Sequence, residues 1–156
     1  MRPISNNSSE IESLIIVDNE AFKENMINIY TAKTFIQYGK VFGLFEGNRL
    51  FGFTIFMRSW SDPNLAYLKK MAIASNHRGK GYGKRLLSQS LQEIKNDHIS
   101  RVVLTVNPNN PPALQLYQKI FHFKVLEKRI KEYGEGQDRL FLELNIDSFH
   151  TEMINE

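Results

Sequence analysis

The chain has 156 residues, of which 42% are hydrophobic and 24% charged, as in ordinary soluble globular proteins. The absence of cysteine excludes disulfides, thiolate metal sites and a cysteine nucleophile. A net charge of +3 permits a nucleic acid or a small polyanion as ligand without requiring either. The polar start MRPISNN lacks the core of a secretory signal, and no apolar run approaches the ~20 residues that span a membrane. We therefore expect one domain at 1–149, a tail at 150–156, no membrane partner and a cytoplasmic location.

The first forty residues contain two helical patterns after a short start at residues 1–5. The first pattern is carried by Ile11, Leu14, Ile15 and Phe22. Residues 6–9 precede it with several side chains that cap helices well. The second pattern runs from about Glu24 to Tyr38 and stops at Gly39, which is typical of a helix end.

From residue 41 the pattern changes to that of strands. The segment 41–60 predicts two aromatic-rich strands joined at Gly47-Asn48, a strong hairpin signal. After a turn at residues 62–64, the segment LAYLKKMAIA (65–74) predicts a third, long strand. The chain thus places three consecutive strands before its next helix.

The second half alternates strands and helices. A helix is expected through Leu87, Leu91 and Ile94, followed by a short strand at 101–106 and a helix at 111–121. Two further strands, 123–130 and 139–146, are separated by YGEGQD. This order implies a mixed α/β sheet, with both parallel and antiparallel neighbours.

A basic, glycine-rich stretch stands where the third strand meets the next helix. Its residues are Arg78, Gly79, Lys80, Gly81, Tyr82, Gly83 and Lys84. Cations at a helix start are disfavoured by about 0.3–1 kcal/mol each, because the helix dipole is already positive there. Glycines expose backbone amides, and the first turn of a helix has free N–H donors. The stretch therefore predicts a pyrophosphate site, the alternative being a glycine-rich turn under a solvated basic face.

Two other phosphate-binding motifs do not fit this stretch. A P-loop requires Ser or Thr after Gly-Lys, whereas Arg85 follows Lys84 here. The dinucleotide fingerprint requires a third glycine, and the two possible positions hold Lys84 and Leu86.

The pattern that fits is Arg-x-x-Gly-x-Gly, formed by Arg78, Gly81 and Gly83. A second motif, Asn-Pro-Pro-Ala-Leu-Gln-Leu-Tyr at 110–117, follows about thirty residues later. Together with the order of elements, these motifs resemble the GNAT N-acetyltransferase superfamily over roughly residues 4–146. The resemblance implies a predominantly antiparallel sheet with a splayed central strand pair flanked by helices.

The resemblance also implies an activity. It indicates acetyl-CoA as cosubstrate, no metal, and direct transfer of the acetyl group in a ternary complex. The acceptor is then a primary amine on a small molecule, a peptide or a protein, and a homodimer is possible. Two alternatives stay open, a catalytically weak acetyl-CoA sensor of the same fold and a nucleic-acid binder. The second lacks the interleaved aromatic residues that such proteins show.

By resemblance, the coenzyme contacts the backbone of Met71, Ala72 and Ile73, the loop 78–84, and the helix start at Asn110 and Ala113. Tyr117 would protonate the departing thiolate. Each residue also has a plainer interpretation. Asn110 is a good N-cap before Pro111, and Tyr117 could be an ordinary core tyrosine.

The general base is not evident from the sequence. Strand 65–74 holds Lys69 and Lys70 but no carboxylate, and Thr105 stands where relatives often carry an acid. Deprotonation through ordered water is expected, with a carboxylate from elsewhere as the alternative.

The segment YGEGQD is expected to form the acceptor side of the site. The candidate acceptor-binding residues are Tyr133, Glu135 and Asp138. Their carboxylates would attract a protonated amine, unless they merely pair with Lys131 or Arg139 in a solvated turn.

Four features lie outside these motifs. Tyr38 and Trp60, like Tyr133, could line an acceptor pocket or simply pack. His77 is interpreted as a solvated neighbour of the glycine loop. Phe121-His122-Phe123 stands where the family usually has Gly-Phe, so the end of that helix must be built differently.

Overall fold

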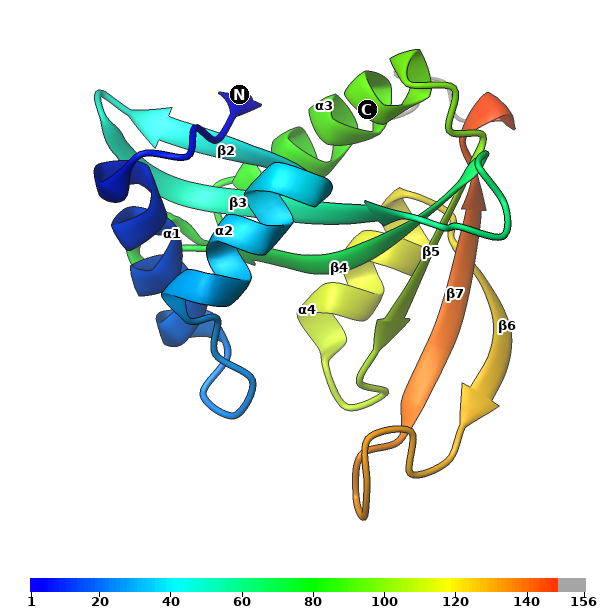
Figure 1. Ribbon diagram of the computed structural model, residues 1–156. Helices are drawn as coiled ribbons and strands as arrows, with labels where there is room; N and C mark the ends of the chain where they lie inside the picture. The colour runs from blue at the N-terminus through cyan, green and yellow to red at the C-terminus, as the bar shows by residue number, and fades with distance from the viewer. Residues whose placement is uncertain (149–156) are drawn as a thin grey trace.

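One seven-stranded sheet, in the order β1-β2-β3-β4-β5-β7-β6, runs through the molecule (Figure 1). The computed structural model describes residues 1–148, so the expected tail at 150–156 lies outside the described residues. Among residues 1–148, β4 and β5 are the one parallel pair of neighbours. The strands are β1 (Arg2–Pro3), β2 (Lys40–Glu46), β3 (Arg49–Arg58), β4 (Leu65–Ile73), β5 (Arg101–Val106), β6 (Lys124–Arg129) and β7 (Arg139–Asn145). The expected mixed, predominantly antiparallel sheet is confirmed.

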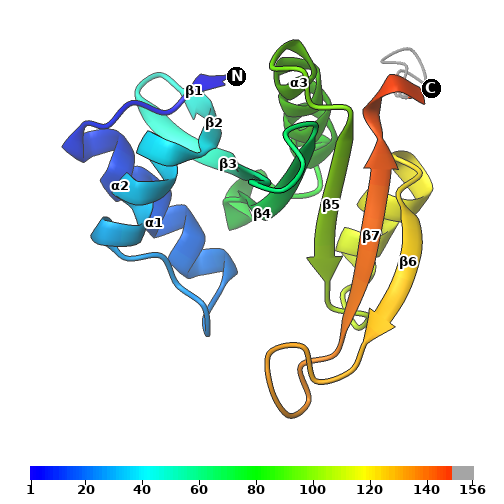
Figure 2. The ribbon, with the colours of Figure 1, turned by 45° about the vertical axis from the view of Figure 1, so that its right-hand side comes forward.

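Helices cover both faces of this sheet (Figure 2). The helices are α1 (Ser8–Ala21), α2 (Ile29–Tyr38), α3 (Tyr82–Asn96) and α4 (Pro111–Leu114), which continues as the π-helix η2 (Gln115–Ile120). Two short 3₁₀ turns are η1 (Ser75–His77) and η3 (Ile146–Ser148). On one face, α1 and α2 pack over a core that includes Phe53 and Ile55. On the other, α3 and η2 pack over Phe56 and Leu104. Full burial of such side chains stabilises the fold by about 1.5–3 kcal/mol each.

The second helix begins later than the sequence suggested. We expected helix from Glu24, but α2 begins at Ile29, because the Asn28 side chain accepts a hydrogen bond from Thr31 N at 2.9 Å and caps it. The five preceding residues belong to a loop, and Ile27 N there donates to the buried Asp18 carboxylate at 2.6 Å. This loop, residues 22–28, is called the α1–α2 loop below.

The two central strands diverge along their length. The register of β3 and β4 shifts between Ile55 and Phe56, which leaves Lys69 as an extra residue on β4. A bulge of this kind bends the strand that carries it. Accordingly β4 pairs with β5 only over Leu65–Tyr67 against Arg101–Val103, and beyond Tyr67 the strands run apart (Figure 2). The expected splayed strand pair is confirmed, and we call this opening the wedge.

The helix that carries Tyr117 is not a uniform α-helix. It starts as α4, and the segment from Gln115 continues as a π-helix, in which Phe121 N donates to Leu116 O at 3.0 Å. It ends at Ile120 with Phe121 as C-cap, and the next residue, His122, has a φ of +58°, in the left-handed region where glycine is usual. The segment Phe121-His122-Phe123 thus makes the terminal turn without a glycine.

This unusual helix end predicts an effect on stability. His122→Val should lower the free energy of unfolding by about 1–2 kcal/mol, because a β-branched residue fits the left-handed region poorly. His122→Gly should be neutral or slightly stabilising, and urea denaturation measures both variants. His98, with a φ of +64°, is the matched position and should respond to Val in the same direction. Equal stability of His122→Val and wild type would contradict this account.

Candidate active site

A cavity of about 510 Å³ lies between the end of α1, β4, the start of α3 and the α4–η2 helix. Most of the predicted coenzyme residues line it, namely Met71, Ala72, Ile73, Arg78, Gly79, Gly81, Tyr82, Gly83, Lys84, Asn110, Ala113 and Tyr117. Lys80 does not line it, and its ammonium group instead donates to Asn76 O at 3.0 Å. We call this the main cavity. Met71 and Tyr117, which are 46 positions apart in the sequence, meet in it.

The glycine loop, residues 78–84, presents its backbone to the main cavity. Gly79 and Gly81 have φ values of +73° and +79°, which other residues adopt only with strain. Gly81 is the N-cap of α3 and offers no capping side chain, so the amides of the first turn keep their donors for another acceptor. The first turn of α3 also lacks an acidic residue.

The cations beside these amides form no close ion pairs in the described part of the chain, although the charge of Arg78 acts on the Glu20 carboxylate and helps to lower its pKa. Within residues 1–148, neither Arg78 nor Lys80 nor Lys84 forms a salt bridge. Arg78 is held in place by the hydrogen bond from its Nε to Ile73 O, at 2.8 Å. Free amides, a positive helix end and unneutralised cations together fit a pyrophosphate group.

Gly83 provides a direct test of this fit. A Cβ added there would project to 3.5 Å from Met71 Cε and 4.0 Å from the Leu116 side chain, both of which line the main cavity. A methyl group would make ordinary contacts, whereas a branched side chain would occupy the space beside the loop amides. The absence of a side chain at Gly83 therefore leaves space in the cavity for a ligand group bound by the loop amides.

Tyr117 points toward β4 from the π-helical segment. Its hydroxyl lies 4.0 Å from Met71 Sδ, and its ring packs edge-on against Phe123 with centroids 5.6 Å apart. Burial raises the pKa of Tyr117 above the ordinary phenol value, so its hydroxyl stays protonated near neutral pH. A neutral, positioned phenol is a proton donor.

Asn110 performs the capping role that its sequence context suggested. Its Oδ1 accepts a hydrogen bond from Ala113 N at 3.2 Å, and Pro111 follows at the first helical position. The same residue also lines the main cavity. The cap fixes the start of the helix that carries Tyr117.

A second group of polar side chains lies where β4 and β5 part. The Tyr67 hydroxyl is 3.1 Å from Thr105 Oγ1, which is 3.2 Å from the Tyr133 hydroxyl, and the two phenols are 3.5 Å apart. We call these three residues the hydroxyl trio. The sequence analysis did not identify Tyr67 as a candidate. The available signal was its position on the predicted strand 65–74, two residues before Lys69-Lys70.

The two phenols of the trio are shifted in opposite directions. Burial raises the pKa of Tyr67 to about 12. Partial burial acts the same way on Tyr133, but hydrogen bonds with Thr105 and Tyr67 and the charge of Lys69 outweigh it and lower its pKa. Tyr133 is therefore the member of the trio that gives up its proton more readily.

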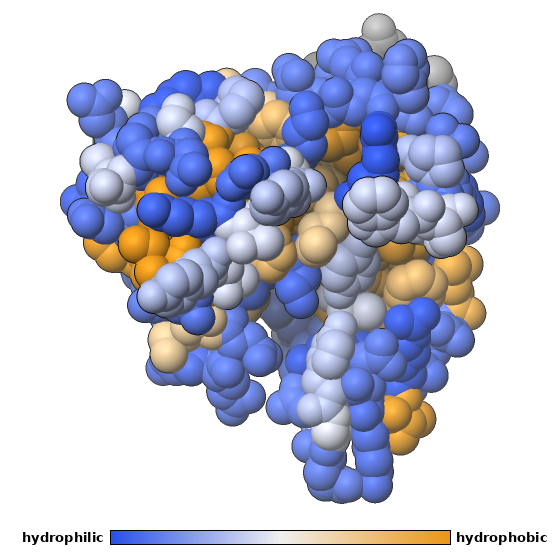
Figure 3. Space-filling model, viewed as in Figure 1, coloured by the Kyte–Doolittle hydropathy of each residue, from blue (hydrophilic) through white to orange (hydrophobic). Residues whose placement is uncertain are grey.

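The trio includes a residue of the β6–β7 loop. Tyr133 belongs to the loop between β6 and β7, which projects from the same end as the α1–α2 loop (Figure 1). The space-filling view shows the surface hollowed between the lower ends of these two parts (Figure 3). A substrate entering there would reach the vertex of the wedge.

The two predicted acidic residues of this loop are engaged with lysines. The Glu135 side chain is 84% exposed and pairs with Lys131 at 2.6 Å. Asp138 accepts a hydrogen bond from Lys131 N at 3.0 Å and pairs with Lys128 at 3.3 Å, and these contacts lower its pKa. This arrangement corresponds to the alternative in which the acids stabilise a solvated turn.

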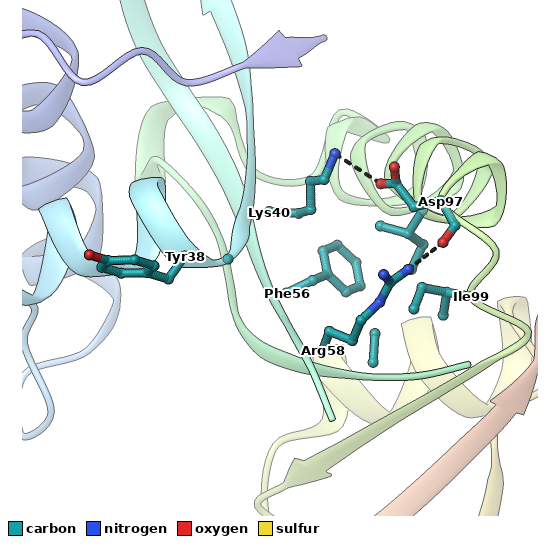
Figure 4. Close-up of a pocket in the computed structure, with 9 residues that line it drawn as sticks. Tyr38, Lys40, Phe56, Arg58, Asp97 and Ile99 are labelled. Atoms are coloured by element: carbon teal, nitrogen blue, oxygen red, sulfur yellow. Dashed lines mark hydrogen bonds and ion pairs between the residues drawn. The ribbon is translucent and has the colours of Figure 1, made fainter. Parts of the chain in front are cut away.

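Two aromatic candidates, Tyr38 and Trp60, do not line the main cavity. Trp60 is fully exposed, and Tyr38 stands at the rim of a smaller cavity with its ring directed away from Phe56 (Figure 4). His77 does line the main cavity, but it is not a solvated neighbour of the loop, since its side chain is 17% exposed and stacks on Phe51 with ring centroids 4.3 Å apart. Plain packing, the alternative for both residues, is therefore wrong for Trp60, and Tyr38 is 79% exposed at the smaller cavity.

The smaller cavity, of about 210 Å³, has its charges already paired. Lys40 forms a salt bridge with Asp97 at 3.0 Å, and Arg58 donates to Asp97 O at the end of α3 (Figure 4). These cations stabilise a helix C-terminus, which is a structural role. Among the described residues there is no cluster of three metal-ligating side chains, and no helix is long and apolar enough to cross a membrane.

Comparison with known proteins agrees with the geometry of the site. Residues 10–123 match the Acetyltransferase (GNAT) family, and the chain belongs to this family. An N-alpha-acetyltransferase of Saccharolobus solfataricus is 25% identical over 140 residues, covering 83% of each chain. A mycothiol acetyltransferase of Corynebacterium efficiens is 29% identical over 122 residues, covering 72% of this chain and 40% of the relative.

The fold has a solved counterpart with the coenzyme bound. The structure of yncA, a putative acetyltransferase from Salmonella typhimurium with acetyl-CoA, superposes with a TM-score of 0.76 at 16% identity, covering 92% of each chain. The protein is thus an acetyltransferase.

The glycine loop yields a binding prediction. Gly83→Val should weaken acetyl-CoA binding at least about 100-fold, because the branched side chain would enter the space beside the phosphate-binding amides. Isothermal titration calorimetry measures the effect. Gly83→Ala is the matched control, since its Cβ makes only ordinary contacts and the protein should fold. Unchanged acetyl-CoA affinity in the valine variant would remove this loop from the coenzyme site.

Proposed function

We propose that the protein transfers the acetyl group of acetyl-CoA directly to a primary amine while both substrates are bound. The observation that carries this proposal is the arrangement at the wedge. The glycine loop, the β4 backbone and Tyr117 surround the main cavity. The hydroxyl trio lies at the vertex of the wedge, where β4 and β5 part. With no cysteine in the chain, no acetyl-cysteine intermediate can form.

The main cavity would bind and orient the coenzyme. Loop amides and the cations Arg78 and Lys84 would hold the pyrophosphate, while Met71, Ala72 and Ile73 contribute backbone beyond the last residue that pairs with β5. Acetyl-CoA supplies a thioester carbonyl, which an amine can attack. Orientation of the two reactants is itself a large part of catalysis in such a site.

Tyr117 is proposed as the general acid. Its raised pKa keeps the phenol protonated, and its hydroxyl faces Met71 across the cavity. It would donate its proton to the thiolate that leaves. This role requires the hydroxyl of Tyr117 and not only its ring.

The hydroxyl trio is proposed to remove a proton from the amine. Tyr133 has the lowered pKa, and Tyr67 and Thr105 lie within hydrogen-bond distance of it. A proton taken from the amine, directly or through a water, could pass along these hydroxyls to solvent beside the exposed Tyr133. This route replaces the strand carboxylate that the sequence lacks.

The same chemistry favours an α-amino group as acceptor. An α-amine has a pKa near 8, so roughly one molecule in ten is neutral at pH 7, against roughly one in 2,500 for a lysine side chain. A site without a carboxylate base suits the more acidic amine. The relative in Saccharolobus solfataricus is named an N-alpha-acetyltransferase, whereas the mycothiol enzyme represents the small-molecule class.

The role of Tyr117 can be tested by removing only its hydroxyl. Tyr117→Phe should lower kcat by about 10²–10⁴-fold, as is typical for a lost general acid, with little change in acetyl-CoA affinity. Coenzyme release with a panel of tetrapeptides that have free α-amines measures turnover. A near-normal kcat would assign the proton to another donor. A wild-type chain that binds acetyl-CoA but turns over no amine would favour the sensor alternative.

The hydroxyl trio can be tested by a pH profile. Tyr133→Phe should lower kcat about 10–10²-fold and move the alkaline rise of kcat to higher pH, because the phenol with the lowered pKa is lost. Tyr67→Phe should lower kcat in the same direction. The control is Tyr38→Phe, whose ring stands away from the wedge at the smaller cavity (Figure 4). Identical profiles for wild type and Tyr133→Phe would exclude this route.

A further inference from the structure

The α1–α2 loop is held by one buried ion pair. Lys70 Nζ lies 2.8 Å from Asp18 Oδ1 and also donates to the backbone oxygen of Asn25. The other carboxylate oxygen, Asp18 Oδ2, accepts a hydrogen bond from Ile27 N at 2.6 Å. Two backbone groups of the loop are therefore fastened to the same pair of side chains. We call Lys70 and Asp18 the loop clamp.

The clamp is buried to an extent unusual for charged residues. The side chain of Asp18 is 0% exposed and that of Lys70 is 9% exposed. Burying two charges has a large desolvation cost, and an apolar pair of similar volume is often as stable or more so. Burial accordingly lowers the pKa of Lys70, against the effect of Asp18. The clamp is therefore poorly explained as a source of stability alone.

The clamp connects the loop to the chemistry of β4. Lys70 directly precedes Met71, which lines the main cavity, and directly follows the bulged residue Lys69. Its ammonium group also lies 4.4 Å from the centroid of the Phe22 ring. Phe22 begins the loop and lines the main cavity. Lys70 therefore connects the bulge on β4, through direct contacts, to the first residue of the α1–α2 loop.

We propose that the loop clamp is a positioning pair, which fixes the α1–α2 loop as one wall of the acceptor cleft. The loop has no helix or strand of its own, and four consecutive residues, 23–26, are exposed. Without the contacts to Asn25 O and Ile27 N, its backbone would have no fixed path opposite the β6–β7 loop. The clamp acts on acceptor binding and not on the proton transfers. This inference rests on the proposed function, because it assumes that an amine binds at the wedge.

The test replaces the clamp by neutral side chains of similar size, in the double variant Asp18→Asn with Lys70→Met. Both charges are removed together, so no unpaired buried charge remains. Lys40→Met with Asp97→Asn is the matched control, a Lys–Asp pair of the same chemistry at the smaller cavity (Figure 4). The control pair contacts neither the α1–α2 loop nor the main cavity.

Two readouts separate positioning from general damage. Trypsin cleavage after Lys23, an exposed loop residue, should become about tenfold faster in the clamp variant and stay unchanged in the control. The KM for free-amine tetrapeptides should rise about tenfold or more, while acetyl-CoA affinity stays within about threefold. Unchanged cleavage and unchanged peptide KM would overturn the proposal.

A measurement on the wild type covers the case in which the clamp variant does not fold. The Ile27 amide lies outside every helix and strand, yet hydrogen exchange followed by NMR should show it protected about 100-fold or more. Rapid exchange of this amide would overturn the clamp directly. If wild-type protein acetylates no amine, the proposed function fails while the cleavage and exchange results still report on the loop. A faster cleavage with an unchanged peptide KM would refute positioning and leave the proposed function intact.

Discussion

The parting of β4 and β5 after Tyr67 is the constraint on which the site depends. A parallel pair held by only three residues from each strand is followed by residues of β4 that pair with β3 alone. The bulge at Lys69 supplies the bend, and it also determines which face Lys70 occupies. The same irregularity thereby opens the wedge, places Met71 in the main cavity and directs Lys70 toward the α1–α2 loop. A regular, fully paired β4 would leave space for neither substrate.

Charge is distributed in two contrasting ways around this opening. At the glycine loop, cations gather at a positive helix end, and Arg78, Lys80 and Lys84 form no salt bridge within residues 1–148. Such an arrangement is unfavourable without an anion, so at the proposed coenzyme site part of the binding energy would relieve it. At the α1–α2 loop, by contrast, Lys70 and Asp18 satisfy each other and two backbone groups. The glycine-loop cations are suited to an anionic ligand, whereas the Lys70–Asp18 pair holds a segment of the chain.

Features that depend on neighbouring residues could be predicted from the sequence. The cap at Asn110, the glycines of the loop and the hairpin at Gly47 follow from local backbone preferences. Features that depend on tertiary contacts could not. Lys70 and Asp18 are 52 residues apart, and Tyr67 meets Tyr133 across 66. The late start of α2 belongs to this second group, because the capping residue and the clamp, and not helix propensity, end the loop at Asn28.

The two tyrosines proposed for proton transfer differ in environment as their tasks require. Tyr117 is surrounded by Met71 and Phe123, where burial raises its pKa and keeps its proton available for a leaving group. Tyr133 is half exposed beside Thr105, Tyr67 and the charge of Lys69, which lower its pKa. Environments that push the pKa values of like groups apart are how one site assigns acid and base roles. The wedge separates these environments, because one tyrosine approaches from the π-helix and the other from the β6–β7 loop. The proton leaving the amine and the proton reaching the thiolate would therefore use different side chains. No proton would have to pass from one tyrosine to the other within a turnover.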